Sequence, residues 1–183
     1  MRKIKILAIS GSLRSDSTNT YILKYIGKLF PEQIDFQIFE GLDKLPHFNP
    51  AVCDDNTAVA EFRRKISEAD SVIICTPEYA FGVPGVLKNA LDWTVSTGDF
   101  NEKAVAAISA SPLNTGGDKA LASLLLTLTA LGTNKDDRSS LSIPNIKQKI
   151  DFEGLITDQS LANELLSITE SLLQKVSLKL KIS

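Results

Sequence analysis

The chain has 183 residues, of which 43% are hydrophobic and 23% charged, and a formal net charge of −2. A chain of this length can bury a full core, so we expect a single domain over residues 1–183. The weak net charge argues against binding to nucleic acid. No apolar run approaches the ~20 residues of a membrane-spanning helix, and Lys3 and Lys5 interrupt the N-terminal apolar stretch. We therefore expect no secretion signal, no membrane partner and a cytoplasmic location.

Five short segments have the composition of β-strands. Residues 4–9, 71–76 and 104–110 are almost wholly apolar, which is typical of strands that are buried on both faces of a parallel sheet. Residues 34–39 alternate apolar and polar side chains, and residues 139–143 form a weaker strand pattern. Segments of this kind are expected at or near the edges of the sheet.

Apolar residues at helical spacing separate these strands. The pattern predicts helices over residues 21–29, 58–69, 84–95 and 120–131, and a last helix of about twenty residues from residue 158. The tail, residues 176–182, alternates with period two, so the sequence does not define where that helix ends. The alternation of strands and helices predicts an α/β fold with a five-stranded parallel sheet, in the order 2-1-3-4-5, and helices on both faces. Ligands of such sheets bind beyond the carboxyl ends of the strands, beside the first strand.

The loop between the first strand and the first helix is rich in short polar side chains. It contains Ser10, Ser12, Arg14, Ser15, Ser17, Thr18, Asn19 and Thr20. The N-terminus of a helix has free N–H groups, and together with hydroxyls and a guanidinium they suit a phosphate dianion. The same composition fits an ordinary surface loop, in which Ser17 or Asn19 caps the helix and Arg14 is solvated. This loop does not decide the function without the rest of the chain.

Two further loops follow the other central strands and should emerge at the same edge of the sheet. The loop after the second apolar strand contains a rigid and aromatic run, Pro77, Glu78, Tyr79, Ala80 and Phe81. The loop after the third apolar strand, residues 111–117, ends in Gly116 and Gly117, which allow the backbone to approach a ligand closely. A phosphate-binding loop beside two loops that can flank a flat ring system predicts a mononucleotide site.

The sequence gives no sign of metal or acid–base chemistry. His47, the only histidine, lies in a long irregular stretch, residues 41–56, with no second histidine near it. We expect a surface histidine there and no metal site. Cys53 and Cys75 cannot form a disulfide framework, and Cys75, within an apolar strand, should pack as a small hydrophobic residue. We assign no catalytic residue, because no acid–base pair stands out.

Three motifs carry a resemblance to a known family. They are Gly11-Ser-Leu-Arg14 with Ser17 and Asn19, then Thr76-Pro-Glu-Tyr79, and then the run from Val83 to Trp93. With them the chain resembles the NADPH-dependent FMN reductases, flavodoxin-like proteins that include quinone, azo and chromate reductases. The resemblance covers nearly the whole chain and is weakest from Asp136 on. It implies bound FMN, NADPH or NADH as co-substrate, ping-pong transfer to a flavin, quinone or similar small acceptor, and a homodimer or homotetramer.

The resemblance also implies roles for individual residues. Those that would hold the FMN phosphate are Ser12, Arg14, Ser17, Thr18, Asn19 and Thr20. Those that would line the isoalloxazine are Pro77, Glu78, Tyr79, Ala80 and Phe81, and Ser111 to Gly117 would close over its other edge. The family usually has asparagine after the tyrosine, then a small residue and serine, whereas this chain has Ala80, Phe81 and Gly82. This departure leaves the electron acceptor open.

Other classes of protein share this topology. A Rossmann dehydrogenase needs G-x-G-x-x-G after the first strand, and a P-loop NTPase needs G-x-x-x-x-G-K-[ST]; the chain has neither. A receiver domain needs acidic residues where this chain has Ser10 and Thr76. A non-enzymatic electron carrier of the flavodoxin kind stays open, although such carriers tend to be strongly acidic, and so does a flavin-binding sensor. Phe81 and Phe100, which we expect near the rim, favour an oligomer with each flavin near a subunit boundary. Both rings could instead pack over the loops, Phe100 in particular.

Overall fold

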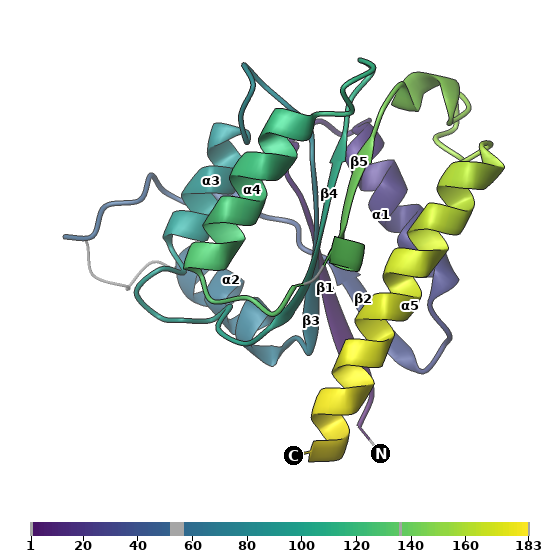
Figure 1. Ribbon diagram of the computed structural model, residues 1–183. Helices are drawn as coiled ribbons and strands as arrows, with labels where there is room; N and C mark the ends of the chain where they lie inside the picture. The colour runs from purple at the N-terminus through teal and green to yellow at the C-terminus, as the bar shows by residue number, and fades with distance from the viewer. Residues whose placement is uncertain (1, 52–56, 136, 183) are drawn as a thin grey trace.

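The structure is a computed structural model that describes residues 2–51, 57–135 and 137–182. Its five strands form one parallel sheet in the order β2-β1-β3-β4-β5 (Figure 1). The strands are β1 (Ile4–Ser10), β2 (Ile34–Ile38), β3 (Ser71–Thr76), β4 (Ala104–Ala110) and β5 (Ser140–Ile143). The predicted strand order is confirmed, and the two weaker segments form the edges of the sheet.

Helices cover both faces of this sheet, as the sequence predicted. The long helices are α1 (Thr18–Leu29), α2 (Thr57–Glu68), α3 (Gly85–Asp92), α4 (Asp118–Ala130) and α5 (Gln159–Ile182), and the short 3-10 segments are η1 (Leu42–Lys44), η2 (Asp137–Ser139) and η3 (Ile146–Gln148). Figure 1 shows α1 and α5 on one face and α2, α3 and α4 on the other. Among the described residues, no helix has both the length and the apolar character required to cross a membrane.

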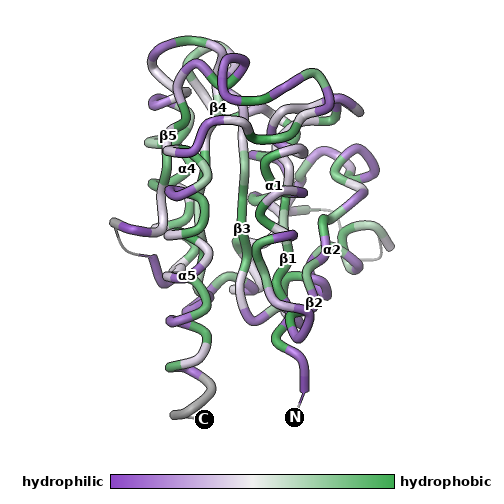
Figure 2. Tube along the Cα trace, turned by 90° about the vertical axis from the view of Figure 1, so that its right-hand side faces the viewer, coloured by the Kyte–Doolittle hydropathy of each residue, from purple (hydrophilic) through white to green (hydrophobic). Residues whose placement is uncertain are grey.

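The core consists of two layers, one on each face of the sheet. Along β1 the side chains of Leu7 and Ile9 enter the layer under α2 and α3, whereas Ile6 and Ala8 enter the layer under α1 and α5. This alternation follows from the two-residue period of a strand. Every residue of β3 and β4 is buried, and hydrophobic residues run through the middle of the fold along β1 and β3 (Figure 2). The near-continuous apolar runs in the sequence reflect this double burial.

The helix boundaries differ from the sequence prediction by up to three residues. Pro84 is the N-cap of α3 and not a residue of its first turn, and α3 ends at Asp92. The last helix continues to Ile182, so the period-two pattern of its tail does not interrupt it. Leu172 and Val176 of α5 are buried against the sheet, and this contact holds the helix where the local pattern is ambiguous.

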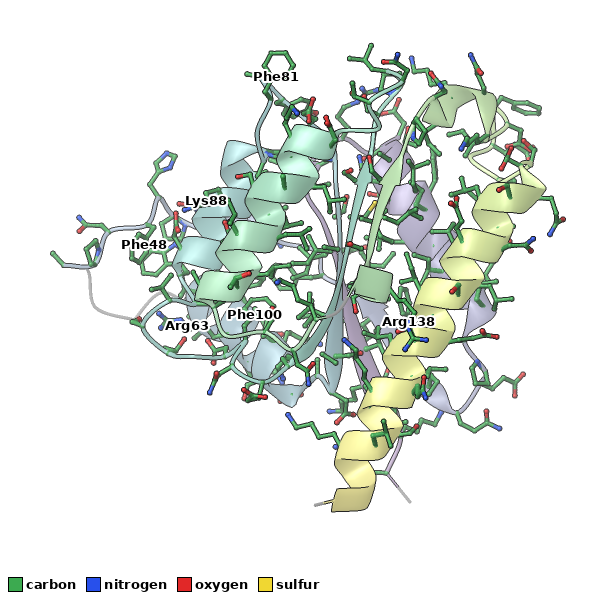
Figure 3. All side chains as sticks on the ribbon, viewed as in Figure 1. Phe48, Arg63, Phe81, Lys88, Phe100 and Arg138 are labelled. Atoms are coloured by element: carbon green, nitrogen blue, oxygen red, sulfur yellow. The ribbon has the colours of Figure 1, made fainter. Side chains whose placement is uncertain are left out.

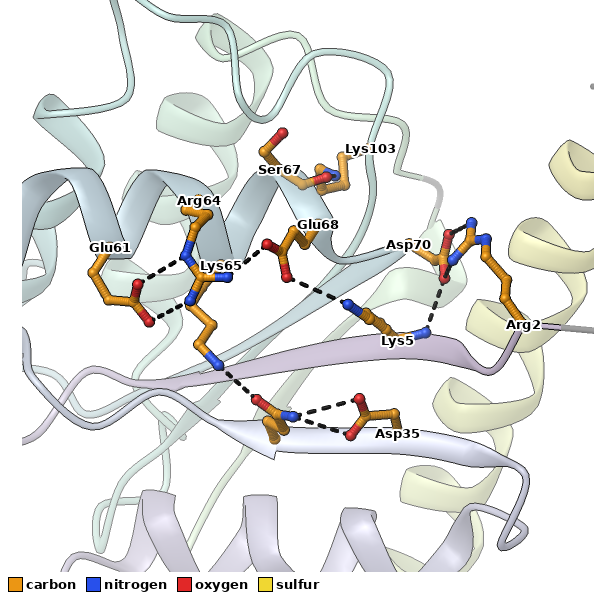
Figure 4. Close-up of polar contacts among 11 residues, drawn as sticks. Arg2, Lys5, Asp35, Glu61, Arg64, Lys65, Ser67, Glu68, Asp70 and Lys103 are labelled. Carbon is orange, nitrogen blue, oxygen red and sulfur yellow. Dashed lines mark hydrogen bonds and ion pairs between the residues drawn. The ribbon is translucent and has the colours of Figure 1, made fainter.

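Ion pairs join the amino end of the sheet to helix α2 (Figure 4). Arg2 Nη1 and Nη2 donate to the carboxylate of Asp70 at 2.8 and 2.5 Å, and the backbone N–H of Lys5 donates to the same group at 2.8 Å. Lys5 Nζ also pairs with Glu68 at 3.3 Å. These contacts lie at the end of the sheet opposite to the loops that the sequence singles out.

Candidate flavin site

A cavity of about 640 Å³ lies at the carboxyl ends of the strands, within the range of about 300–1,000 Å³ that small-molecule sites occupy. The loops after β1, β3 and β4 line it together, as predicted, and the segment after β5 joins them. Its lining residues are Ser12, Arg14, Asp16, Ser17, Thr18, Asn19, Tyr21, Pro77, Glu78, Tyr79, Ala110, Ser111, Pro112, Leu113, Ile146, Lys147, Ile150 and Phe152.

A second cavity, of about 590 Å³, lies at the opposite end of the sheet. Its walls include Arg2, Asp70 and Lys103, whose polar groups already bind one another or the backbone: Lys103 Nζ, for example, donates to the carbonyl oxygen of Ala69 at 2.6 Å. Because parallel α/β sheets bind ligands at the carboxyl ends of their strands, we place the candidate site in the first cavity.

The structure brings most of the predicted residues to one cavity but not all of them. Predicted residues in its lining are Ser12, Arg14, Ser17, Thr18, Asn19, Pro77, Glu78, Tyr79, Ser111, Pro112 and Leu113. Those outside its lining are Thr20, Ala80, Phe81, Asn114, Thr115, Gly116 and Gly117. The side chain of Thr20 is turned to the strand instead, where its hydroxyl lies 2.9 Å from that of Ser10, and it lines a neighbouring cavity of about 380 Å³.

The N-terminus of α1 faces the first cavity with unsatisfied donors. Ser17 is the N-cap in extended conformation, but its hydroxyl makes no capping hydrogen bond. The N–H groups of a first helical turn have no partner within the helix, so they remain available to an anion. Asn19 does not cap the helix either, since it lies inside α1, is buried, and its Oδ1 accepts a hydrogen bond from Cys75 Sγ at 3.3 Å. Burial raises the pKa of the Cys75 thiol, so this cysteine packs as the sequence predicted.

Arg14 and Asp16 form an ion pair at the wall of this cavity, with Nη2 and Oδ2 3.2 Å apart. The side chains are 68% and 67% exposed, so the pair sits in water. The hydrogen bond from Arg14 holds the pKa of Asp16 below its usual value. Asp16 was not among the predicted site residues, and the pair means that an incoming anion must compete with a carboxylate for the guanidinium.

The loop after β3 is anchored by its carboxylate. Glu78 Oε2 accepts a hydrogen bond from the backbone N–H of Ala120 at 2.9 Å, and Ala120 lies in the first turn of α4. Glu78 therefore caps a helix that follows the next strand. Glycine at position 117 leaves room for this contact. A Cβ there would be tightly packed, at 3.4 Å from Glu78 Cβ and 3.3 Å from Ser109 Cβ.

The same loop ends in a tight turn that holds two side chains away from the cavity. Tyr79 and Gly82 exchange backbone hydrogen bonds of 3.1 and 3.0 Å, and Ala80 and Phe81 between them have φ of 49° and 59°. Positive φ at both central residues is the signature of a type I′ turn, which favours Asn-Gly. Phe81 is 79% exposed at the tip (Figure 3). Phe100, in contrast, is fully buried in the core, so the expectation that it lies exposed near the rim was wrong.

The loop after β4 packs against β5. The hydroxyl of Ser109 donates to the carbonyl oxygen of Gly116 at 2.8 Å, and the backbone N–H of Leu113 donates to Ser111 Oγ at 3.1 Å. Gly116 has φ +66°, and a Cβ on it would overlap Ser142 Oγ. The two glycines thus fit the loop between its neighbours, whereas Ser111 lines the cavity.

The largest set of residues that the sequence reading missed comes from the segment after β5. Ile146, Lys147, Ile150 and Phe152 line the cavity. The segment docks on the loop after β4, because the backbone N–H of Ile146 donates to the carbonyl oxygen of Ser111 at 3.1 Å. No local motif marks it, and it belongs to the part of the chain where the family resemblance is weakest.

The run from Val83 to Trp93 serves mainly to pack. Leu87, Ala90, Leu91 and Trp93 are buried, as expected for core positions. Trp93 Nε1 donates to the carbonyl oxygen of Pro46 at 2.9 Å, and Phe48 meets the Trp93 ring edge-on at 5.1 Å between centroids, which fixes the long loop on α3 (Figure 3). His47 is exposed in that loop. Within the described ranges no three His, Cys, Asp or Glu side chains gather as metal ligands; Cys53 lies outside these ranges.

A five-stranded parallel sheet in the order 2-1-3-4-5, with a helix N-terminus and a ligand-sized cavity at its carboxyl edge, defines a flavodoxin-like mononucleotide-binding protein. Residues 4–148 match the family model of the NADPH-dependent FMN reductases, and the chain belongs to that family. It is therefore an NAD(P)H-dependent oxidoreductase whose cofactor is FMN.

Individual relatives agree with this family. The chain is 33% identical over 167 residues to an NAD(P)H-dependent FMN reductase of Pseudomonas aeruginosa, with 89% of each chain covered. It is 33% identical over 186 residues to an NADPH:quinone oxidoreductase of Arabidopsis thaliana, covering 97% of this chain and 94% of the other. Among solved structures, it is similar to FerB, a flavoenzyme NAD(P)H:(acceptor) oxidoreductase of Paracoccus denitrificans. The TM-score is 0.85 and the identity 28%, over 95% of this chain and 97% of that one.

Proposed function

We propose that this protein passes reducing equivalents from NAD(P)H through FMN to a quinone or a free flavin, in two half-reactions that share one cavity. The observation that carries the proposal is the composition of this cavity. Anion donors gather at the N-terminus of α1, and mostly apolar or aromatic side chains line the loops opposite. Relatives named as FMN and quinone reductases support the two acceptor classes.

We assign the FMN phosphate to the loop after β1 and the first turn of α1. The donor set fits a dianion: the hydroxyls of Ser12, Ser17 and Thr18, the guanidinium of Arg14, and first-turn N–H groups that no capping side chain occupies. Asn19 is also part of this wall. In the same proposal Pro77, Glu78, Tyr79 and Ser111 border the ring system.

When bound, FMN accepts a hydride from the nicotinamide and returns electrons to the acceptor, so the protein has to bind and orient rather than supply an acid or a base. The residues of this chain have suitable roles. Glu78 fixes the loop after β3 against α4 through Ala120, and Tyr79, 54% exposed, leaves an aromatic rim at the opening. Stacked substrates can enter and leave over such a rim in turn.

We also propose a homodimer or homotetramer, in which each site lies near a subunit boundary. Three hydrophobic side chains on or beside α3 and α4 are largely exposed: Phe81 (79%), Leu126 (73%) and Val95 (63%). Exposed apolar surface of this kind commonly marks a protein interface. Light scattering that gives twice the 19.9 kDa chain mass or more would support the proposal, and a monomer at micromolar concentration would refute it.

A single domain over residues 1–183 and a cytoplasmic location remain proposals from the sequence.

The function is tested by separating its two half-reactions. Purified holoprotein is mixed anaerobically with NADPH, and the flavin absorbance is followed; menadione is then added after the excess NADPH has been removed. Bleaching in the first step and recovery in the second support ping-pong transfer. Flavin-loaded protein that NADPH and NADH cannot reduce would instead favour an electron carrier that receives its electrons from another protein.

A further inference from the structure

The segment after β5 forms a small hairpin at the mouth of the flavin site. We call residues 149–157 the 149–157 hairpin. Ile150 and Ile156 form an antiparallel pair. The backbone N–H of Asp151 donates to the carbonyl oxygen of Leu155 at 3.0 Å, and the backbone N–H of Thr157 donates to the carbonyl oxygen of Lys149 at 2.9 Å. The hairpin follows η3 directly and reaches back over the start of α1.

Side-chain contacts hold the tip of this hairpin in one conformation. Asp151 Oδ1 accepts hydrogen bonds from the backbone N–H groups of Glu153 and Leu155, at 2.9 and 2.8 Å. Gly154 has φ +80° and lies against the ring of Tyr21, which a Cβ at this position would overlap. The tip is thus fastened both internally and to the helix that carries the proposed phosphate site.

This fastened tip presents an aromatic ring to water. Phe152 is 93% exposed, yet it is part of the lining of the flavin cavity. A phenyl ring held in water at the mouth of a site forgoes the hydrophobic stabilisation that burial would give. It offers a flat apolar face on which an aromatic ring of a ligand can stack.

Lys147 belongs to η3 and lines the same cavity as Phe152. The other charged groups of the lining are engaged: Arg14 pairs with Asp16, and Glu78 accepts the N–H of Ala120. Lys147, in contrast, has neither a hydrogen bond nor an ion pair with any described residue. The wall after β5 thus combines an uncommitted ammonium group with an exposed aromatic ring.

We propose that Lys147 and Phe152 bind the adenosine-diphosphate part of NAD(P)H: adenine stacks on Phe152, and Lys147 pairs with a phosphate. This inference rests on the proposed function. Of the proposed substrates, the pyridine nucleotide brings both a purine and several negative charges. A simple quinone brings neither, and a free flavin brings no purine. A lysine suits a flexible phosphate as a compact point charge, and aromatic rings stack readily on purines.

The test compares variants with neighbours that the cavity does not include. Lys147→Met is paired with Lys149→Met, and Phe152→Ala is paired with Leu155→Ala, because Lys149 and Leu155 belong to the same hairpin but lie outside the lining. Equilibrium binding of NADP⁺ to the holoprotein is measured by calorimetry. We expect the dissociation constant to rise about 5- to 20-fold for each site variant, the size of one lost contact of about 1–1.8 kcal/mol, and to change less than twofold for the controls.

Steady-state kinetics provide a second readout. The KM for NADPH should rise with the dissociation constant, while the KM for menadione, a neutral quinone, should not change. Site variants that bind NADP⁺ as the wild type does would overturn the inference. So would a rise in the menadione KM of the same size, which would make this wall an acceptor site, or a change in oligomer mass for Phe152→Ala, which would make it a subunit contact.

The proposed function fails in a different way. It fails if wild-type holoprotein is not reduced by NAD(P)H, whereas the adenosine subsite fails if the wild type is reduced normally and the four variants cannot be told apart. Binding of 2′,5′-ADP and of 5′-ADP to wild type and Lys147→Met then identifies the phosphate. A selective loss for 2′,5′-ADP assigns Lys147 to the 2′-phosphate of NADPH, and equal losses assign it to the pyrophosphate; unchanged binding of both overturns the pairing.

Discussion

Glu78 and Ala120 are 42 residues apart in the chain, and the carboxylate of the first accepts the backbone N–H of the second at 2.9 Å. This hydrogen bond joins the loop after β3, which lines the candidate cavity, to the first turn of α4. A carboxylate at a helix N-terminus is also favoured by the helix dipole. The contact therefore connects the stability of α4 to the shape of the site.

Loss of this cap should cost stability and affinity together. Glu78→Ala should lower the free energy of unfolding by about 1–2 kcal/mol, the usual effect of removing an N-cap acceptor, and should weaken FMN binding. Glu78→Gln keeps an acceptor oxygen and should recover most of the loss. Urea unfolding of the apoprotein and fluorescence titration with FMN measure the two effects. If Glu78→Gln lost as much stability and FMN affinity as Glu78→Ala, the hydrogen bond to Ala120 would not be the source of these effects.

Arg14→Ala tests the proposed phosphate site. A charge-assisted contact to the FMN phosphate would be lost, so FMN affinity should fall by about 10- to 100-fold. Riboflavin has the same ring and no phosphate, and its affinity should hardly change. If both ligands weaken equally, the loop has been disrupted and the phosphate assignment is not supported. Asp16→Asn provides the reciprocal test: because the carboxylate competes for Arg14, its removal should strengthen FMN binding and leave riboflavin binding unchanged.

The Ala80-Phe81 turn should be open to stabilisation. Left-handed backbone costs a non-glycine residue about 1–2 kcal/mol, and asparagine tolerates it better than alanine, particularly at the first central position of a type I′ turn. Ala80→Asn should therefore raise the free energy of unfolding by about 0.5–1 kcal/mol. Ala80→Val, a β-branched control, should lower it. Thermal and urea unfolding measure both, and a valine variant as stable as the asparagine one would argue against strain at this turn.

Asp70 should give the protein a stability that is lost in acid. Burial opposes ionisation of this carboxylate, but hydrogen bonds from Arg2 and from the N–H of Lys5 outweigh it, and the pKa of Asp70 lies below its usual value. Because the pKa of Asp70 is lower in the folded protein than in the unfolded chain, its ionised carboxylate stabilises the fold. This contribution is complete above the pKa of the unfolded chain, about 3.9, and it is lost as the pH falls through the pKa of the folded protein.

Asp70→Asn should accordingly cost about 1–2 kcal/mol near pH 7, with a difference from wild type that shrinks below pH ~4. Asp35→Asn is a suitable control, since the carboxylate of Asp35 is contacted by the side chain of Gln37 on the surface of β2. Urea titrations at a series of pH values measure the difference. If the difference in free energy of unfolding between Asp70→Asn and wild type stayed constant over this pH range, the assignment would be contradicted.

The fold could be predicted because each element has a local signature. Strands buried on both faces, such as β3, are apolar throughout, and the alternation with helices leaves few topologies for a parallel sheet. Helix ends could not be predicted where tertiary contacts determine them. The end of α5 is an example, because the local pattern of its tail did not define it.

The site could be predicted only as far as its residues adjoin strand ends. The loops after β1, β3 and β4 carry Ser12, Arg14, Glu78, Tyr79 and Ser111, and the rule for parallel sheets places them together. The roles of Ala120 and Phe152 depend on contacts with residues distant in the chain, which have no local pattern. Phe100 was misplaced for the same reason: its surroundings in the core come from segments far away in sequence.

The burial of Cys75 bears on the quinone acceptor that we propose. Quinones are electrophiles that add to thiolates, and a reductase with a quinone acceptor would meet one at every cycle. The thiol of Cys75 is fully buried in β3, contacts Asn19 of the proposed phosphate site, and has a raised pKa. It therefore offers neither access nor a thiolate. The strand at the centre of the sheet would in this way be protected from arylation by the quinones that we propose as acceptors.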